Sequence, residues 1–170
     1  MRVKITSDTV RFRWRKSYEM SSTLPQRYTI YVACPGERPF FGWMKNFVWV
    51  EEDVDTDTDG DSYPRDSRTW TELTMITRDE RDERFDVDPV QQNPLILKVR
   101  SEIQELAARA AYALAVYTGG GVSKQADGSF DAPDVLIPYM GKTFDLAAAL
   151  QRNEWLKYPA HKSRADTGSC

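Results

Sequence analysis

Apolar and polar residues alternate along much of the first half of the chain, which is the pattern of half-buried β-strands. In residues 9–16, TVRFRWRK, the apolar residues Val10, Phe12 and Trp14 are separated by arginines. Residues 1–6 alternate in the same way. Further strands are predicted at residues 27–34, 46–51 and 67–78. The first half of the chain therefore predicts an antiparallel sheet.

The hydrophobic period changes in the second half of the chain. Asn93 is a good N-cap residue, Pro94 suits the first helical turn, and the next glycine or proline is Gly119. The apolar residues in this interval recur in steps of three, four and seven, which places them on one helical face. A long helix is therefore predicted over residues 94–118, closed by the glycines at 119–121.

The remaining segments predict shorter elements. A second helix is expected from Thr143 to about Tyr158, and residues 37–45 read as an aromatic loop or an irregular strand. Residues 79–88, DERDERFDVD, predict an exposed connection or a short charged helix. Asp127-Gly128 favours a hairpin turn.

These elements predict an α+β fold, in which an antiparallel sheet of about four to six strands packs against one long and one shorter C-terminal helix. A chain of 170 residues is long enough for one sizeable core and short for two. We therefore expect a single domain at residues 1–158 and a flexible tail at residues 159–170.

The composition predicts a cytoplasmic protein with no membrane contact. No apolar stretch approaches the roughly 20 residues that span a bilayer, and the N-terminus lacks the apolar run of a secretory signal. The two cysteines, Cys34 and Cys170, have no paired spacing and fit a reducing compartment.

Charge is distributed unevenly, although the formal net charge is only −3. Residues 1–16 hold six basic residues and a single acidic one, Asp8. Residues 51–88 hold fifteen acidic residues and five arginines. This asymmetry says more about binding partners than the net charge does.

The acidic run DVDTDTDGD, residues 53–61, permits two interpretations beyond that of a solvated loop. As a calcium loop its start is similar to that of an EF-hand, but Pro64 and the short Asp66 depart from that pattern, and strands are predicted on both sides. The candidate calcium ligands are Asp55, Asp57, Asp59, Asp61 and Asp66. Alternatively, a basic partner surface relieves the repulsion between the crowded carboxylates, unless Arg65, Arg68, Arg78 and their neighbours fold back and pair with them.

The basic strand at residues 9–16 provides a third hypothesis, nucleic-acid binding. Arg11, Arg13 and Arg15 share one face, and Trp14, Tyr31, Phe41 and Trp43 are near enough in sequence to suggest an aromatic platform for single strands. However, Phe12 and Trp14 point away from the arginines in a regular strand, and the acidic chain attracts phosphate poorly. A nucleic-acid partner is therefore not favoured.

No catalytic constellation is visible in the sequence. The single histidine, His161, lies beyond Pro159 in the predicted tail, and two distant cysteines provide no zinc spacing. The glycines at 119–121 close a predicted helix, whereas a phosphate loop opens one. We therefore assign no catalytic residue, no metal and no cofactor, and expect a protein that is not an enzyme.

One segment suggests a family. Residues 111–128, AYALAVYTGGGVSKQADG, form an alanine-rich helix that ends in Thr-Gly-Gly and leads into an acidic glycine turn. This segment, about a tenth of the chain, resembles parts of bacterial immunity proteins, the small cytosolic inhibitors that neutralise secreted antibacterial toxins. The resemblance implies a non-catalytic inhibitor of a bacterial toxin.

The expected partner is thus another protein with a basic surface, and the oligomeric state is left open. Acidic side chains would supply the electrostatic contacts, and exposed aromatic side chains would supply apolar anchors, if the core does not bury them. The candidate partner-binding residues are Glu51, Asp53, Asp55, Asp57, Asp59, Asp61, Phe41 and Trp43.

Overall fold

The computed structural model describes residues 27–49, 52–58 and 67–154. The strands predicted at residues 1–6 and 9–16 and the tail predicted at residues 159–170 lie outside the described residues.

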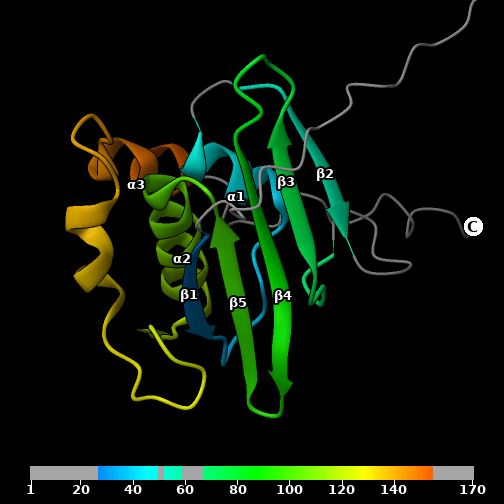
Figure 1. Cartoon of the computed structure of the whole chain (residues 1–170), viewed down its shortest axis with the longest axis vertical. Helices are drawn as coiled ribbons and strands as arrows, with labels where there is room; N and C mark the ends of the chain where they lie inside the picture. The colour runs from blue at the N-terminus through cyan, green and yellow to red at the C-terminus, as the bar shows by residue number, and fades with distance from the viewer. Residues whose placement is uncertain (1–26, 50–51, 59–66, 155–170) are drawn as a thin grey trace, which may run out of the picture.

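The described part of the chain forms one six-stranded antiparallel sheet with helices, so the predicted α+β fold is confirmed (Figure 1). The strand order is β2-β3-β4-β5-β1-β6. The strands are β1 (Tyr28–Ala33), β2 (Val54–Thr58), β3 (Leu73–Thr77), β4 (Arg84–Gln92), β5 (Leu95–Ser101) and β6 (Val122–Ser123). The helices are α1 (Phe41–Val48), α2 (Gln104–Thr118), the 3-10 helix η1 (Pro133–Tyr139) and α3 (Leu146–Glu154).

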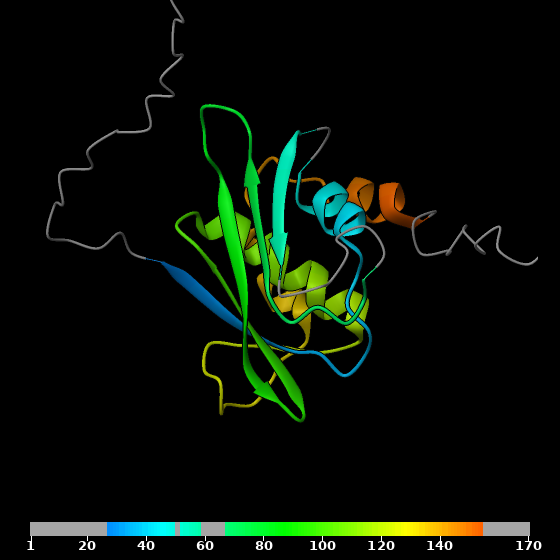
Figure 2. The ribbon, with the colours of Figure 1, turned by 90° about the vertical axis from the view of Figure 1, so that its right-hand side faces the viewer.

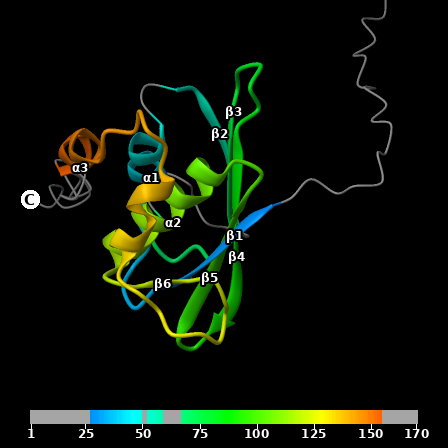
Figure 3. The same ribbon diagram turned by 60° about the vertical axis from the view of Figure 1, so that its left-hand side comes forward.

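All the described helices lie on one face of the sheet (Figures 2 and 3). Helix α2 packs against β1, β4 and β5, and α1 lies between α2 and α3. Alanines such as Ala110 and Ala111 are fully buried, and their small side chains let α2 approach the sheet closely. No described element covers the opposite face, which we call the outer face.

Strand β5 corrects the predicted long helix. Residues 95–101 pair with β4 and β1, and the helix begins only at Gln104. Asn93-Pro94 lies in the turn between β4 and β5 and does not begin a helix. The period-two alternation of buried Leu97 and Val99 with Lys98 and Arg100 was the signal for a strand, but the apolar steps that continue into α2 masked it.

Helix α1 corrects the aromatic loop predicted at residues 37–45 and, over its described residues, the strand predicted at residues 46–51. One face of this helix is buried and carries Phe41, Met44, Phe47 and Val48. The β-branched and aromatic residues at 47–49 favour a strand on propensity alone, but burial against α2 and α3 decides for a helix that ends at Val48.

The predicted end of α2 is confirmed. Gly119 adopts a left-handed conformation, with φ of 71°, and its N–H donates to the carbonyls of Ala115 and Val116. Gly120 lies so close to the backbone of Ala33 that an added Cβ would come within 1.7 Å of the Ala33 carbonyl oxygen. A glycine is therefore required at each position for a different reason.

Other boundaries differ in detail. Asp145, in place of Thr143, caps the last helix, since its carboxylate accepts the Ala148 N–H at 2.9 Å. The predicted end of this helix at Tyr158 lies outside the described residues. Residues 79–83 form a turn, and the chain continues as β4 from Arg84 instead of as a charged helix. Among the residues that the structure describes, no helix has the length and apolar character needed to cross a membrane.

Candidate functional site

The acidic segment lies at one edge of the sheet. Strand β2 pairs with β3 and is the terminal strand in the described order. Asp55 and Asp57 lie on this strand, and Asp53 directly precedes it. We call β2 together with these three aspartates the acidic edge. Other acidic residues assigned to the partner or calcium site lie outside the described residues, namely Glu51, Asp59, Asp61 and Asp66.

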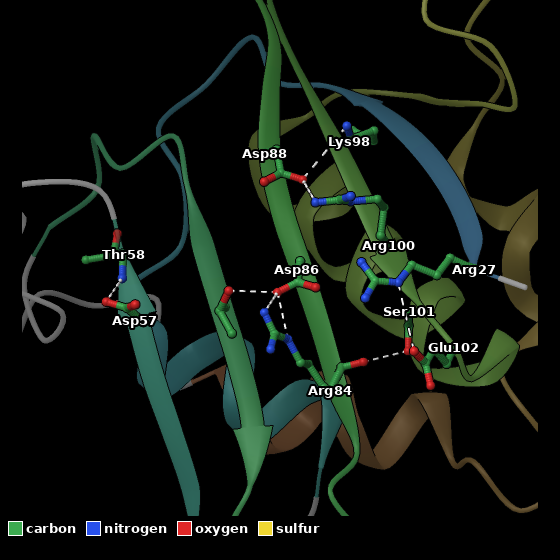
Figure 4. A network of polar contacts seen from close by, with 11 residues as sticks. Arg27, Asp57, Thr58, Arg84, Asp86, Asp88, Lys98, Arg100, Ser101 and Glu102 are labelled. Carbon is green, nitrogen blue, oxygen red and sulfur yellow. Dashed lines mark hydrogen bonds and ion pairs between the residues drawn. The ribbon is translucent and has the colours of Figure 1, made fainter. Parts of the chain in front are cut away.

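The carboxylates of the acidic edge project from the outer face. Thr56 is paired with Met75, whose side chain is fully buried on the helix-covered face. Because side chains alternate along a strand, Asp55 and Asp57 point the other way. Both residues are exposed, and Asp57 lies on the same face as the polar side chains of β4 and β5 (Figure 4).

Arg78 partly neutralises the acidic edge from inside the chain. Its Nε donates to Oδ1 of Asp55 at 2.7 Å, and its Nη1 donates to Oδ2 of Asp53 at 3.2 Å. The hydrogen bond from Arg78 lowers the pKa of the Asp55 carboxyl below its usual value. These side chains are more than half exposed, so the ion pairs contribute little to stability and are open to exchange with another cation.

Asp57 is different from the other two aspartates. Its carboxylate accepts a hydrogen bond from the Thr58 N–H, at 2.9 Å (Figure 4). No ion pair between described residues involves Asp57. Its negative charge is therefore the least compensated charge of the acidic edge.

A second arginine, Arg81, forms ion pairs with three acidic residues at the turn between β3 and β4. It contacts Glu52 at 2.8 Å, Glu83 at 3.6 Å and Asp79 through its Nε. Glu83 in turn accepts a hydrogen bond from the indole of Trp49 at 2.9 Å. This turn is therefore only partly neutralised from within the fold, because one arginine faces three acids.

The acids of the central strand β4 are also neutralised within the fold. Asp86 is 9% exposed and accepts hydrogen bonds from Arg84 at 2.9 Å and from the Thr74 hydroxyl at 2.8 Å. Burial raises the pKa of Asp86, but hydrogen bonds from Arg84 and Thr74 outweigh this effect and hold it below its usual value. Asp88 contacts Arg100 and lies 3.9 Å from Lys98 (Figure 4).

The charge network of β4 and β5 was not predicted from the sequence. A usable signal was present, because Arg84, Asp86 and Asp88 alternate with buried Phe85 and Val87. Reading residues 79–88 as one charged unit hid that alternation.

Phe41 and Trp43 are not surface anchors, which corrects their assignment to the partner site. Phe41 is 4% exposed and packs edge-on against Trp70, with ring centroids 6.0 Å apart. Trp43 is 1% exposed, stacks on Phe47 and meets Tyr117 edge-on. Helix α1 turns both rings into the core, so neither can be presented to a partner or a base.

The alternatives of calcium and nucleic acid gain no support. Among described residues, no group of three or more His, Cys, Asp or Glu side chains could hold a metal ion. Asp55 and Asp57 lie on an extended strand instead of the tight turn of a calcium loop, and Arg78 already engages Asp55. The arginines of the nucleic-acid hypothesis, Arg11, Arg13 and Arg15, lie outside the described residues.

Cys34 is poorly suited to nucleophilic chemistry. Its thiol is buried, and burial raises its pKa to about 12. It borders an open pocket of about 380 Å³, which Gly120, Phe130 and Asp131 also line. Because the thiolate is the nucleophilic form, this environment disfavours covalent catalysis at Cys34.

Comparisons with known proteins found no match, whether with family models, with curated proteins or with solved structures. We therefore infer function from the geometry and electrostatics of the acidic edge.

Proposed function

We propose that this protein is a non-catalytic inhibitor that binds another protein through its acidic edge. The observation that carries this proposal is the exposed Asp57, which has no cationic partner among the described residues, beside Asp55 on a terminal strand. A basic partner surface would supply the missing counter-charge. The outer face of the sheet, which no described element covers, lies next to these carboxylates (Figure 3).

The electrostatics of this surface favour fast, salt-sensitive association. Clustered charges of one sign steer an oppositely charged partner toward the site and act mainly on the association rate. Arg78 is an exposed counter-ion that a partner's lysine or arginine can replace at Asp53 or Asp55. Arg78 therefore partly balances the charge of Asp53 and Asp55 in the free protein, and a partner can still bind these carboxylates.

The finer assignment, an immunity protein that acts in the bacterial cytoplasm, rests on the resemblance of residues 111–128. In the fold this segment covers the end of α2 and the turn after β6, away from the acidic edge. It supports the class of protein and does not supply binding residues. The partner would then be a toxin with a basic surface.

The test compares matched charge variants in partner binding. The variant D55N/D57N removes two charges from the acidic edge, and D127N/D131N removes two exposed charges near β6, at the opposite end of the described sheet. A partner is captured by the wild type from cells of the source organism, purified, and tested for association kinetics and for loss of its own activity. We expect D55N/D57N to slow association about tenfold at low salt and D127N/D131N to change it by less than about twofold.

Two results would contradict the proposal. Equal kinetics and equal salt dependence for the two variants would remove the acidic edge from the interface. A captured protein whose activity is unaffected by saturating wild type would show that binding does not inhibit.

A further inference from the structure

The backbone of β2 presents hydrogen-bonding groups on the side away from β3, where no described strand pairs with them, as well as charge. The Arg78 N–H donates to the Asp53 carbonyl at 2.9 Å, while the N–H of Thr77 turns away and donates to Glu83 at 3.0 Å. Because backbone groups alternate in an antiparallel ladder, those of Asp55 and Asp57 face β3, and those of Val54 and Thr56 face outward. Within the described residues, no strand lies beyond β2.

We propose that the partner adds a strand antiparallel to β2, with lysine or arginine at the two positions opposite Asp55 and Asp57. This inference rests on the proposed function and specifies how the partner is held. Main-chain hydrogen bonds to Val54 and Thr56 would supply affinity, and the two carboxylates would select the sequence.

The geometry of an antiparallel pair sets the positions of the basic residues. Val54 and Thr56 would form the hydrogen-bonded pairs with the added strand, so Asp55 and Asp57 would occupy non-hydrogen-bonded positions. Residues opposite each other at such positions have their Cα atoms only about 4.5 Å apart, and their side chains are in contact. Two basic residues separated by one residue therefore match Asp55 and Asp57.

The intervening partner residue would lie on the other face of the sheet. There Val54 is half-buried and packs against the core, while Thr56 is exposed. A β-branched residue suits this position because it would extend the pleated apolar surface beside Val54. The recognised pattern is thus basic, β-branched, basic.

A second copy of the chain is a poor occupant of this edge. Antiparallel pairing of β2 with β2 would set aspartates against each other, and like charges in opposed positions are destabilising. Charged residues on terminal strands often serve only to prevent such pairing. The experiment must therefore separate recognition of a basic strand from simple protection of the edge.

The probe is a six-residue peptide in which arginine alternates with valine, titrated into the full chain. The control peptide has the same charge but carries N-methylvaline, which removes the N–H donors that would face β2. We expect the unmodified peptide to bind at least about tenfold more tightly than the methylated one. The D55N/D57N variant should weaken binding of the unmodified peptide about fivefold, and D127N/D131N should not.

Amide hydrogen exchange provides a second readout at single residues. In the free protein, the amides of Asp55 and Asp57 should be protected by β3, and those of Val54 and Thr56 should exchange quickly. The unmodified peptide should slow exchange at Val54 and Thr56. The methylated peptide should leave it unchanged.

The possible failures are distinguishable. Equal affinity for the two peptides, without new protection, would overturn strand addition but leave an acidic surface that binds cations, as the proposed function requires. Slow exchange at Val54 and Thr56 in the free protein would mean that the chain itself or a second copy occupies the edge, which also overturns it. Absence of peptide binding, with self-association of D55N/D57N, would make the acidic edge a protective device only.

Discussion

Asp57 on β2 and Asp86 on β4 are the same type of residue on the same face of one sheet, yet their surroundings are opposite (Figure 4). Asp86 is nearly buried, and Arg84 and Thr74 donate to it. Asp57 is exposed, and its carboxylate accepts a hydrogen bond from the backbone N–H of Thr58. Position in the sheet, more than residue type, thus separates an acid that stabilises the fold from an acid that is available to a partner.

The physical reason is the number of neighbouring strands. A central strand has a neighbour on each side, and both can place cations or hydroxyls beside its carboxylates, as Thr74 of β3 does for Asp86 and Arg100 of β5 does for Asp88. A terminal strand has a neighbour on one side. On the acidic edge that neighbour supplies Arg78 to Asp53 and Asp55.

The largest expected effect comes from removing the central acid. Asp86→Ala leaves Arg84 and Thr74 without their shared acceptor, and we expect the free energy of unfolding to fall by about 2 kcal/mol. Asp57→Ala on the terminal strand should lower it by less than about 0.5 kcal/mol. Urea denaturation of the two variants measures both values, and equal losses would contradict the distinction between centre and edge.

An intermediate effect is expected from pH. Arg84 and Thr74 hold the folded-state pKa of Asp86 below its usual value, so the ionised carboxylate stabilises the folded state. This contribution is complete above the unfolded-state pKa, near 3.9, and is lost as pH falls through the lower folded-state pKa. The stability difference between wild type and Asp86→Asn should therefore be constant from about pH 7 to pH 5 and shrink below about pH 4. Denaturation curves across this range would show a pH-independent difference if the interaction were not ionic.

The smallest effect on stability is expected at Arg78. Arg78→Gln removes exposed ion pairs and should change the free energy of unfolding by less than about 0.5 kcal/mol. It also uncovers Asp53 and Asp55, so binding of the arginine–valine peptide should tighten about threefold at low salt and become more salt-sensitive. Lys124→Gln makes the same change in net charge at an exposed site beyond β6 and should have less effect. Weaker binding by Arg78→Gln would indicate that Arg78 orders the site instead of competing for it.

Local pattern predicted much of the fold. The fold class, strand β1 and the close of α2 at Gly119 follow from alternation and from glycine chemistry. The boundaries failed where one segment satisfies two patterns. Residues 95–101 alternate as a strand but also continue the apolar steps of α2, and pairing with β1 and β4 decides between the two.

The candidate site was predicted in part. The acidic run was visible as a sequence, and Asp55 and Asp57 are exposed. Burial of Phe41 and Trp43 was not visible, because aromatic residues at these spacings suit a loop, a strand or a helix equally well. Arg78 was one of three arginines expected to compete for the acidic run, but its pairing with Asp55 could not be read from the sequence. The two residues are 23 positions apart, and only the register of β2 on β3 brings them together.

The sequence by itself determined the alternation of buried and polar positions, the glycine that ends α2 and the concentration of acid at residues 53–61, because these depend on side-chain chemistry and short-range backbone geometry. Only the tertiary structure decided which strand lies at the edge, which acids are neutralised and which aromatic rings are buried. These properties depend on pairing and packing between segments distant in the chain, and local preferences do not encode that pairing.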